Sequence, residues 1–212
     1  MKKHTLFVDI ITFSIIFLFF LLPPFFTEKL SDASDIFSAW NFPLGQFILF
    51  LLALLLYFFY FEKKKKNVIF FPVIMTTSLL FCVALFIKFL SLLLVTENTY
   101  KIILPDSFIS WIFCLLNFSF AAFYEEVVYR FYFPDQLISF LSLKIKWKYL
   151  GILCEVISCL VFALAHLYLG IFSVINAVFG HIILRVCYKK TGLIWTGFVS
   201  HFIYNVISLI LL

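Results

Sequence analysis

The chain has 212 residues, of which 65% are hydrophobic and only 13% are charged, and its mean hydropathy is +1.13. These values lie far outside the range of soluble globular domains and exclude that class. Nearly all of the formal net charge of +5 comes from loop residues. The charge therefore reports orientation in a membrane and gives no evidence for nucleic-acid binding.

Apolar stretches long enough to cross a bilayer as helices recur along the whole chain. Gly and Pro, with 6 residues each, are too sparse for a barrel of short strands. We expect an all-α fold, a polytopic membrane helical bundle of about seven transmembrane helices in one integral membrane domain. The spans are predicted at residues 5–22, 43–61, 68–95, 108–130, 153–169, 171–187 and 193–212. The first is expected to be a retained helix, because no small-residue cleavage site follows it.

Lysines are distributed unevenly between the two sides of the predicted bundle. Only Lys29 and Lys101 fall on the side opposite the amino terminus. The lysines on the other side are Lys2, Lys3, Lys63, Lys64, Lys65, Lys66, Lys144, Lys146, Lys148, Lys189 and Lys190. Because positive charges gather in cytoplasmic loops, we expect a multi-pass protein of the cell membrane. Its amino terminus is predicted in the cytoplasm and its carboxyl terminus outside.

Two segments between the predicted spans are expected at the membrane surface. Residues 25–42 carry acidic side chains and include Trp40, an aromatic residue of the type that anchors a chain at the interface. Residues 131–150 include Pro134 and the run Lys-Ile-Lys-Trp-Lys, which is too polar to span a bilayer. We expect residues 131–150 to form a helix along the inner face of the membrane.

Two carboxylates and a guanidinium, from Glu125, Glu126 and Arg130, lie within the fourth predicted span. Each charge at the centre of a bilayer costs about 2.5–3.5 kcal/mol on insertion scales, so such a cluster predicts a functional site. Glu126 and Arg130 are four residues apart and share a helix face, which permits an ion pair. Glu125 points about 100° away from its neighbour on an ideal helix and is left free for another role. The pair His181 and Arg185 in the sixth span is assigned to packing or snorkelling.

Further polar residues occur at helical spacing in the later spans. The pairs are Phe162 with His166, and His201 with Asn205. Residues four apart project from one face of a helix. Counted by helical rise, Glu125 and His201 both lie in the cytoplasmic half of the bilayer. His166 reaches the same depth when its helix is counted from Val156, because Glu155 indicates that the first turns touch water.

The chemistry of these groups points to hydrolysis of a peptide bond. A carboxylate and two imidazoles can activate a water molecule, either by general base action or around a divalent metal such as zinc. The candidate ligands for such a metal are Glu125, His166 and His201. The imidazole of His201 and the amide of Asn205, one turn apart, can instead face the developing oxyanion of an attacked carbonyl.

Three motifs in this order and spacing resemble the motif set of the CAAX-protease and bacteriocin-processing (CPBP, or Abi) family. They are Glu-Glu-x-x-x-Arg at Glu125, Glu126 and Arg130, Phe-x-x-x-His at Phe162 and His166, and His-x-x-x-Asn at His201 and Asn205. Residues 176–205, with Phe179-Gly180 and Thr191-Gly192-Leu193-Ile194-Trp195, also resemble the family's closing region. Phe131 departs from the pattern, since a glycine often follows the arginine. We therefore predict a catalytic core over residues 106–212 and, over residues 1–105, amino-terminal transmembrane helices without a recognisable signature.

The resemblance implies a polytopic intramembrane endopeptidase. The family's eukaryotic members remove the last three residues of prenylated CAAX proteins, and its bacterial members are associated with peptide processing and bacteriocin self-immunity. By this analogy Glu125 and His166 activate water, Glu126 and Arg130 hold the geometry of the site, and His201 with Asn205 stabilises the oxyanion. The implied partner is a peptide or protein substrate, lipidated or membrane-embedded, within the lipid bilayer. A glutamate acting alone and a bound metal both remain open.

Two other functions are compatible with buried charges in a helical bundle. A catalytically silent scaffold or immunity factor would bind a peptide or partner without cleaving it, and the presence of all the motif residues weighs against it. A proton-coupled or ion transporter would also bury Glu, Arg and His, but it predicts broken helices or an internal repeat. The sequence shows neither feature.

Overall fold

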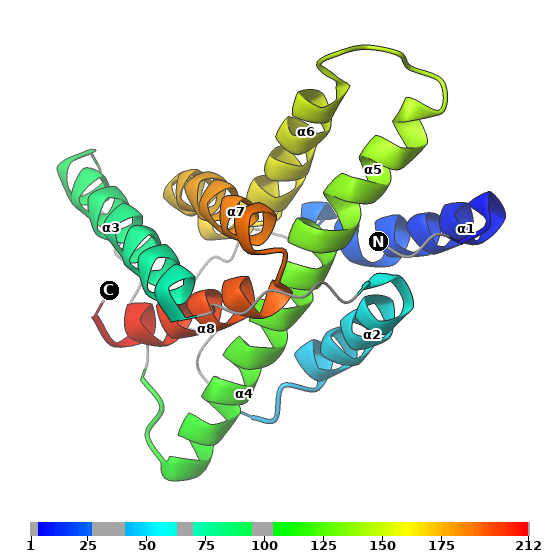
Figure 1. Cartoon of the computed structure of the whole chain (residues 1–212). Coiled ribbons are helices and arrows are strands. Elements are labelled where there is room, and N and C mark those ends of the chain that lie inside the picture. Colours follow the sequence, from blue (N-terminus) through cyan, green and yellow to red (C-terminus); the bar gives the residue numbers. More distant parts are fainter. Residues whose placement is uncertain (1–3, 27–40, 63–69, 95–103, 212) are drawn as a thin grey trace.

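A computed structural model describes residues 4–26, 41–62, 70–94 and 104–211 of the chain (Figure 1). Over these residues the protein consists of helices and contains no strand, which confirms the predicted all-α class. The helices are α1 (Leu6–Ile16), α2 (Leu44–Tyr60), α3 (Phe70–Leu94), α4 (Phe108–Glu125), α5 (Phe133–Ser142), α6 (Leu150–Leu164), α7 (Ile171–Thr191) and α8 (Ile194–Leu211). Short π-helical segments, η1 (Phe17–Leu21) and η4 (Glu126–Tyr132), and 3₁₀ segments, η2 (Pro23–Phe26) and η5 (Leu167–Leu169), extend or join them.

Five of the helical stretches among the described residues are long and apolar enough to cross a membrane: Leu6–Phe26, Phe70–Leu94, Phe108–Ser142, Ile171–Thr191 and Ile194–Leu211. Leu44–Tyr60 and Leu150–Leu164 are shorter apolar helices. Each predicted span therefore corresponds to a helix. The anchor Trp40 and the lysines at 2, 3, 29, 63–66 and 101 lie outside the described residues, so the predicted orientation stays a prediction.

The longest helix differs from the sequence-based expectation. Residues 131–150 were expected to form a separate helix on the inner face, but α4, η4 and α5 form one continuous helical stretch from Phe108 to Ser142 (Figure 1). That expectation is wrong because Pro134 does not end the helix. It lies in the first turn of α5, directly after the π-helical segment, and a widened helix tolerates a proline that an ideal one does not.

The other helices pack around this long helix. Helix α2 contacts α4, α8 contacts α4, and α6 contacts α5 and α7, while α3 packs against α7 and α8. The turn between α7 and α8 depends on Gly192, whose φ of 67° lies in the left-handed region that glycine favours. This turn sends α8 back towards α4, where its polar residues meet those of η4.

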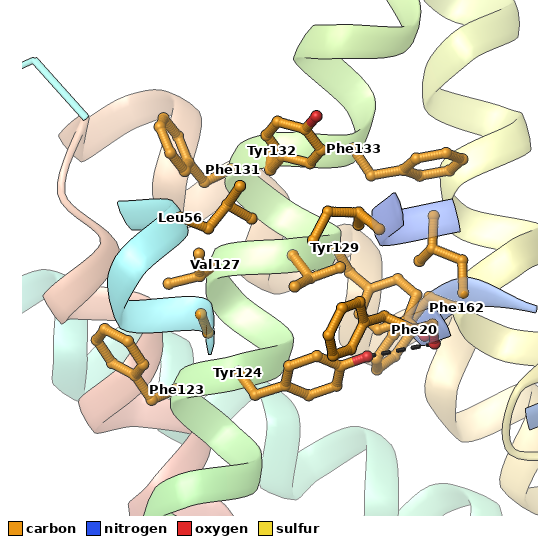
Figure 2. Packing of buried hydrophobic residues seen from close by; sticks show 14 of the residues in the cluster. Phe20, Leu56, Phe123, Tyr124, Val127, Tyr129, Phe131, Tyr132, Phe133 and Phe162 are labelled. Carbon is orange, nitrogen blue, oxygen red and sulfur yellow. Dashed lines mark hydrogen bonds between the residues drawn. The ribbon is translucent and has the colours of Figure 1, made fainter. Parts of the chain in front are cut away.

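The core is centred on η4, whose seven residues are all buried. Figure 2 shows aromatic side chains of this region, such as Tyr129 and Tyr132, packed with Leu56 of α2 and Phe162 of α6. Many large apolar side chains point outward, including Leu55 and Phe58 of α2. This pattern is typical of a bundle surrounded by lipid, so a water-dependent site has to be inside it.

Candidate active site

The π-helical segment changes how the two glutamates face Arg130. Hydrogen bonds in a π-helix join residues five apart, which brings Glu125 and Arg130 to the same side. Arg130 Nη1 lies 3.8 Å from Glu125 Oε2, and Arg130 Nε lies 3.5 Å from Glu126 Oε1. Arg130 Nη1 also donates a hydrogen bond of 3.4 Å to the main-chain oxygen of Glu125. The expectation that Glu125 is left free of Arg130 is therefore wrong, because it assumed an α-helix here.

The two carboxylates differ in exposure. The side chains of Glu126 and Arg130 are each 1% exposed, whereas that of Glu125 is 20% exposed. The guanidinium of Arg130 also stacks on Phe162, with its Cζ 3.8 Å from the ring centroid. Glu126 and Arg130 thus form a buried pair on the core side, and Glu125 faces the accessible side.

His201 of α8 lies between the two carboxylates. Its Nδ1 donates a hydrogen bond of 3.1 Å to Glu126 Oε1. Its Nε2 lies 3.9 Å from Glu125 Oε2, which is too long for a hydrogen bond but close enough for an electrostatic attraction when the ring is protonated. The structure therefore brings His201 to the charged cluster that the sequence analysis singled out.

His166 reaches the same region from a turn. It was expected inside the span 153–169, but α6 begins at Leu150 and ends at Leu164, and His166 follows in the turn before η5. The depth count from Val156 therefore does not apply. His166 Nδ1 is 2.9 Å from the main-chain oxygen of Phe162. Because a carbonyl can only accept, Nδ1 donates the proton in this bond, and the neutral tautomer that fits it has its lone pair on Nε2.

A partly open cavity of about 560 Å³ collects these groups. Its lining includes five of the six predicted site residues: Glu125, Arg130, His166, His201 and Asn205. Glu126 does not line it and lies behind the others. Asn205 follows His201 by one turn of α8, as its spacing predicts. Side chains of α2 and α3, including Leu49 and Val83, form another part of the wall.

Comparison with known proteins agrees with this site. Residues 107–207 match the model of the family described as type II CAAX prenyl endopeptidase Rce1-like. This part of the chain is similar to the Rce1-like family. The match contains all six predicted site residues and leaves α1 to α3 outside it. Proteins of this family are proteases that act on peptide or protein substrates in membranes. Neither the curated proteins nor the solved structures contain a match to the chain.

The cavity also contains polar residues that the sequence analysis did not single out. Tyr168, Asn176 and Tyr204 line it, and Asn176 Nδ2 donates a hydrogen bond of 2.9 Å to the hydroxyl oxygen of Tyr204. An Asn inside a span is a recognisable polar signal. Its partner on α8 could not be found from the sequence, because the pairing depends on how α7 and α8 cross.

His181 lies outside the lining of this cavity, and so does Arg185. His181 is 2% exposed and its ring centroid is 5.5 Å from that of Phe162. Arg185 is 4% exposed and forms ion pairs with Asp135 at 2.6 Å and Glu155 at 2.8 Å. Both residues are packed inside the bundle and neither snorkels to its surface.

The arrangement does not fit a preformed metal site. Across the described part of the chain, no group of three or more His, Cys, Asp or Glu side chains has the geometry to hold a metal ion. Glu125 and His201 approach each other, and the Nδ1 of the third candidate ligand, His166, is engaged by a carbonyl. We therefore derive no catalytic step through a metal.

Proposed function

We propose that the protein is an intramembrane endopeptidase that hydrolyses a peptide bond with a water molecule activated by Glu125 and His166. One observation carries the proposal: a carboxylate and an imidazole from separate segments line one cavity inside an apolar bundle. Burial from lipid and from bulk water strengthens the interactions of such groups with reacting atoms. The family match to residues 107–207 supports the reaction class.

Glu125 and His166 have the features that general base catalysis needs. Glu125 is the more accessible carboxylate of the pair, and a neutral His166 has its lone pair on Nε2 because Nδ1 donates to the Phe162 carbonyl. In the proposed reaction a water oxygen attacks the scissile carbonyl carbon and its proton passes to one of these groups. The carbon–nitrogen bond then breaks, and the same proton passes to the leaving amine. Glu126 and Arg130 hold the geometry of Glu125 from the buried side.

His201 and Asn205 are proposed to stabilise the oxyanion. Nδ1 of His201 already donates to Glu126, so its Nε2 donates to an oxyanion only when the ring is protonated. A protonated His201 would also neutralise the negative charge of the second carboxylate of the cluster, because the single positive charge of Arg130 neutralises only one. The Asn205 side-chain amide supplies a further donor from the cavity wall.

The proposed substrates are peptides or proteins that reach the cavity from within the membrane. The family description favours the carboxyl terminus of prenylated CAAX proteins, and the resemblance to bacterial CPBP members keeps peptide processing and bacteriocin self-immunity as further candidates. A volume of about 560 Å³ is within the range of roughly 300–1,000 Å³ found for ligand pockets. It can therefore enclose part of a substrate and not a folded domain.

A cleavage assay with purified protein in detergent tests this proposal. Matched prenylated and unprenylated peptides are incubated with the wild type, Glu125→Gln and His166→Ala, with and without a chelator. We expect turnover by the wild type and its loss in both variants, with the double variant little worse than either, because residues that act as a unit are not additive. Normal melting temperatures would show that the variants are folded. Full turnover by both folded variants would overturn the assignment, and loss of wild-type turnover with chelator would show metal dependence.

A further inference from the structure

Arg185 of α7 contacts the long helix that contains η4, and it does not line the cavity. Its Nη1 donates a hydrogen bond to the main-chain oxygen of Arg130. Its Nη2 donates to Asp135 of α5 at 2.6 Å, and its Nε donates to Glu155 of α6 at 2.9 Å. One buried guanidinium thus joins α7 to α5, to α6 and to the backbone of η4.

The contact with the Arg130 carbonyl coincides with a missing backbone donor. The bonds between residues five apart end where the N–H of Phe133 donates to the carbonyl of Val128, and α5 begins at Phe133. In the α-helical register that follows, the carbonyl of residue 130 would accept a hydrogen bond from the N–H of residue 134. Residue 134 is a proline and has no N–H. A buried carbonyl without a donor is costly, and helix-breaking prolines inside membranes are tolerated when another group supplies the bond. Arg185 supplies it here.

We propose that Arg185 is a positioning residue that replaces the backbone donor lost at Pro134 and so holds Arg130 against both glutamates. The carbonyl that Arg185 binds and the guanidinium near Glu125 and Glu126 belong to the same residue, Arg130. Fixing the main chain at the end of η4 therefore fixes the origin of that side chain. The role rests on the proposed function, because it concerns the geometry of the same catalytic site.

The two acidic partners explain why an arginine occupies this position. Asp135 and Glu155 bind Nη2 and Nε, which orients the planar group and leaves Nη1 facing the carbonyl. A lysine presents one ammonium on a flexible chain and cannot reproduce this three-way geometry. Arg185→Lys is therefore expected to keep the charge and lose the positioning.

The test is a double-mutant cycle between positions 185 and 134. Arg185→Gln in the wild-type background should lower kcat about 10²-fold, the loss that a displacement of about 1 Å in a catalytic group can cause. KM should change little, because Arg185 does not line the cavity. Pro134→Ala restores an N–H four residues after Arg130. In that background Arg185→Gln should lower kcat less than about 10-fold, although both ion pairs are still lost.

Lys189→Gln is the matched control. Lys189 lies one turn after Arg185 and pairs with the same Glu155, at 2.6 Å, but it does not contact the catalytic helix backbone. Its replacement should leave kcat within about two-fold of the wild-type value, as expected for an exposed ion pair. If Lys189→Gln lowered kcat as much as Arg185→Gln, the network of ion pairs around Glu155 would be what matters. That result would overturn the specific role of the hydrogen bond to the Arg130 carbonyl.

Thermal denaturation extends the cycle to a readout that does not require turnover. If Arg185→Gln folds poorly, Arg185→Lys replaces it. The decrease in melting temperature caused by the substitution of Arg185 should be smaller in the Pro134→Ala background than in the wild type. Equal losses in both backgrounds, in kcat and in melting temperature, would overturn the inference. A wild type that cleaves no peptide but shows this thermal coupling would contradict the proposed function and leave the carbonyl bond established.

Discussion

Two adjacent glutamates occupy different environments in this protein. Glu126 is 1% exposed and is bonded to His201, whereas Glu125 lines the cavity. The difference arises because neighbouring residues on a helix point in different directions, and the π-helical segment then brings Arg130 within reach of both. One arginine can therefore stabilise a buried carboxylate and orient an accessible one.

Arg130→Ala and Asn205→Ala should separate structural support from catalysis. Removing Arg130 leaves the carboxylate of Glu126 without its cation, and breaking such a buried pair costs about 3–5 kcal/mol of folding free energy. Loss of the Asn205 amide should lower turnover by about 10²–10³ with little change in stability. Melting temperature and turnover are measured for both variants together. If Asn205→Ala unfolds the protein while Arg130→Ala only slows it, the two roles are assigned the wrong way round.

Gly197 of α8 provides the space that Glu126 occupies. A Cβ at Gly197 would overlap Oε2 of Glu126, and Gly197 precedes His201 by one turn. Gly197→Ala should therefore displace the carboxylate or α8, weaken the Glu126–His201 bond and lower turnover by about 10²-fold. Turnover and melting temperature are the measurements.

Gly151→Ala is the control for Gly197→Ala, because a Cβ at Gly151 in α6 meets nothing within 4 Å. It should be neutral or stabilising by about 0.5–1 kcal/mol, as is usual when a helical glycine becomes alanine. In a Glu126→Asp background, where the carboxylate is one methylene shorter, Gly197→Ala should cost less stability. An equal cost in both backgrounds would show that the close approach to Glu126 is irrelevant.

At the scale of helices, the cavity is lined by residues outside the family match as well as by residues inside it. Leu49 of α2 and Val83 of α3 line it, although both helices precede residue 107, where the match begins. The amino-terminal helices therefore contribute to the same site as the motif residues, and one structural unit contains both. We therefore expect the segment without a recognisable signature to contribute to substrate binding.

Leu49→Trp tests that contribution. The larger side chain should fill part of the cavity and raise KM for peptide substrates by about 10-fold or more, since filling a pocket removes roughly 1–3 kcal/mol of binding. Leu55→Trp is the control, because Leu55 is 66% exposed on the outer face of the same helix. Steady-state kinetics of the two variants give the comparison. Equal KM values would show that α2 does not take part in substrate binding.

At the scale of the whole molecule, orientation in the membrane is the main prediction that the structure leaves untested. The lysine asymmetry predicts a cytoplasmic amino terminus and an odd number of crossings. Reporter fusions after Lys66 and Lys190 should report the cytoplasm, and a fusion at Leu212 the opposite side. A cytoplasmic reporter signal at Leu212 would contradict the seven-span arrangement.

The sequence by itself determined the membrane class, the all-α fold and the approximate positions of the helices, and it predicted the residues of the candidate site. These properties depend on local hydrophobicity and on spacing along one helix, which need no knowledge of neighbouring helices. Glu125, Glu126 and Arg130 could be singled out because charges inside an apolar span are costly wherever the helix packs.

Only the tertiary structure decided how these residues meet. Glu125 reaches Arg130 because η4 is π-helical, and the carbonyl freed by Pro134 finds its donor on α7. His166 lies in a turn and not in a helix, and His201 bonds to Glu126 because α7 reverses at Gly192 into α8. The physical reason is that these contacts depend on departures from ideal helix geometry and on how whole helices pack, and spacing along one ideal helix gives neither.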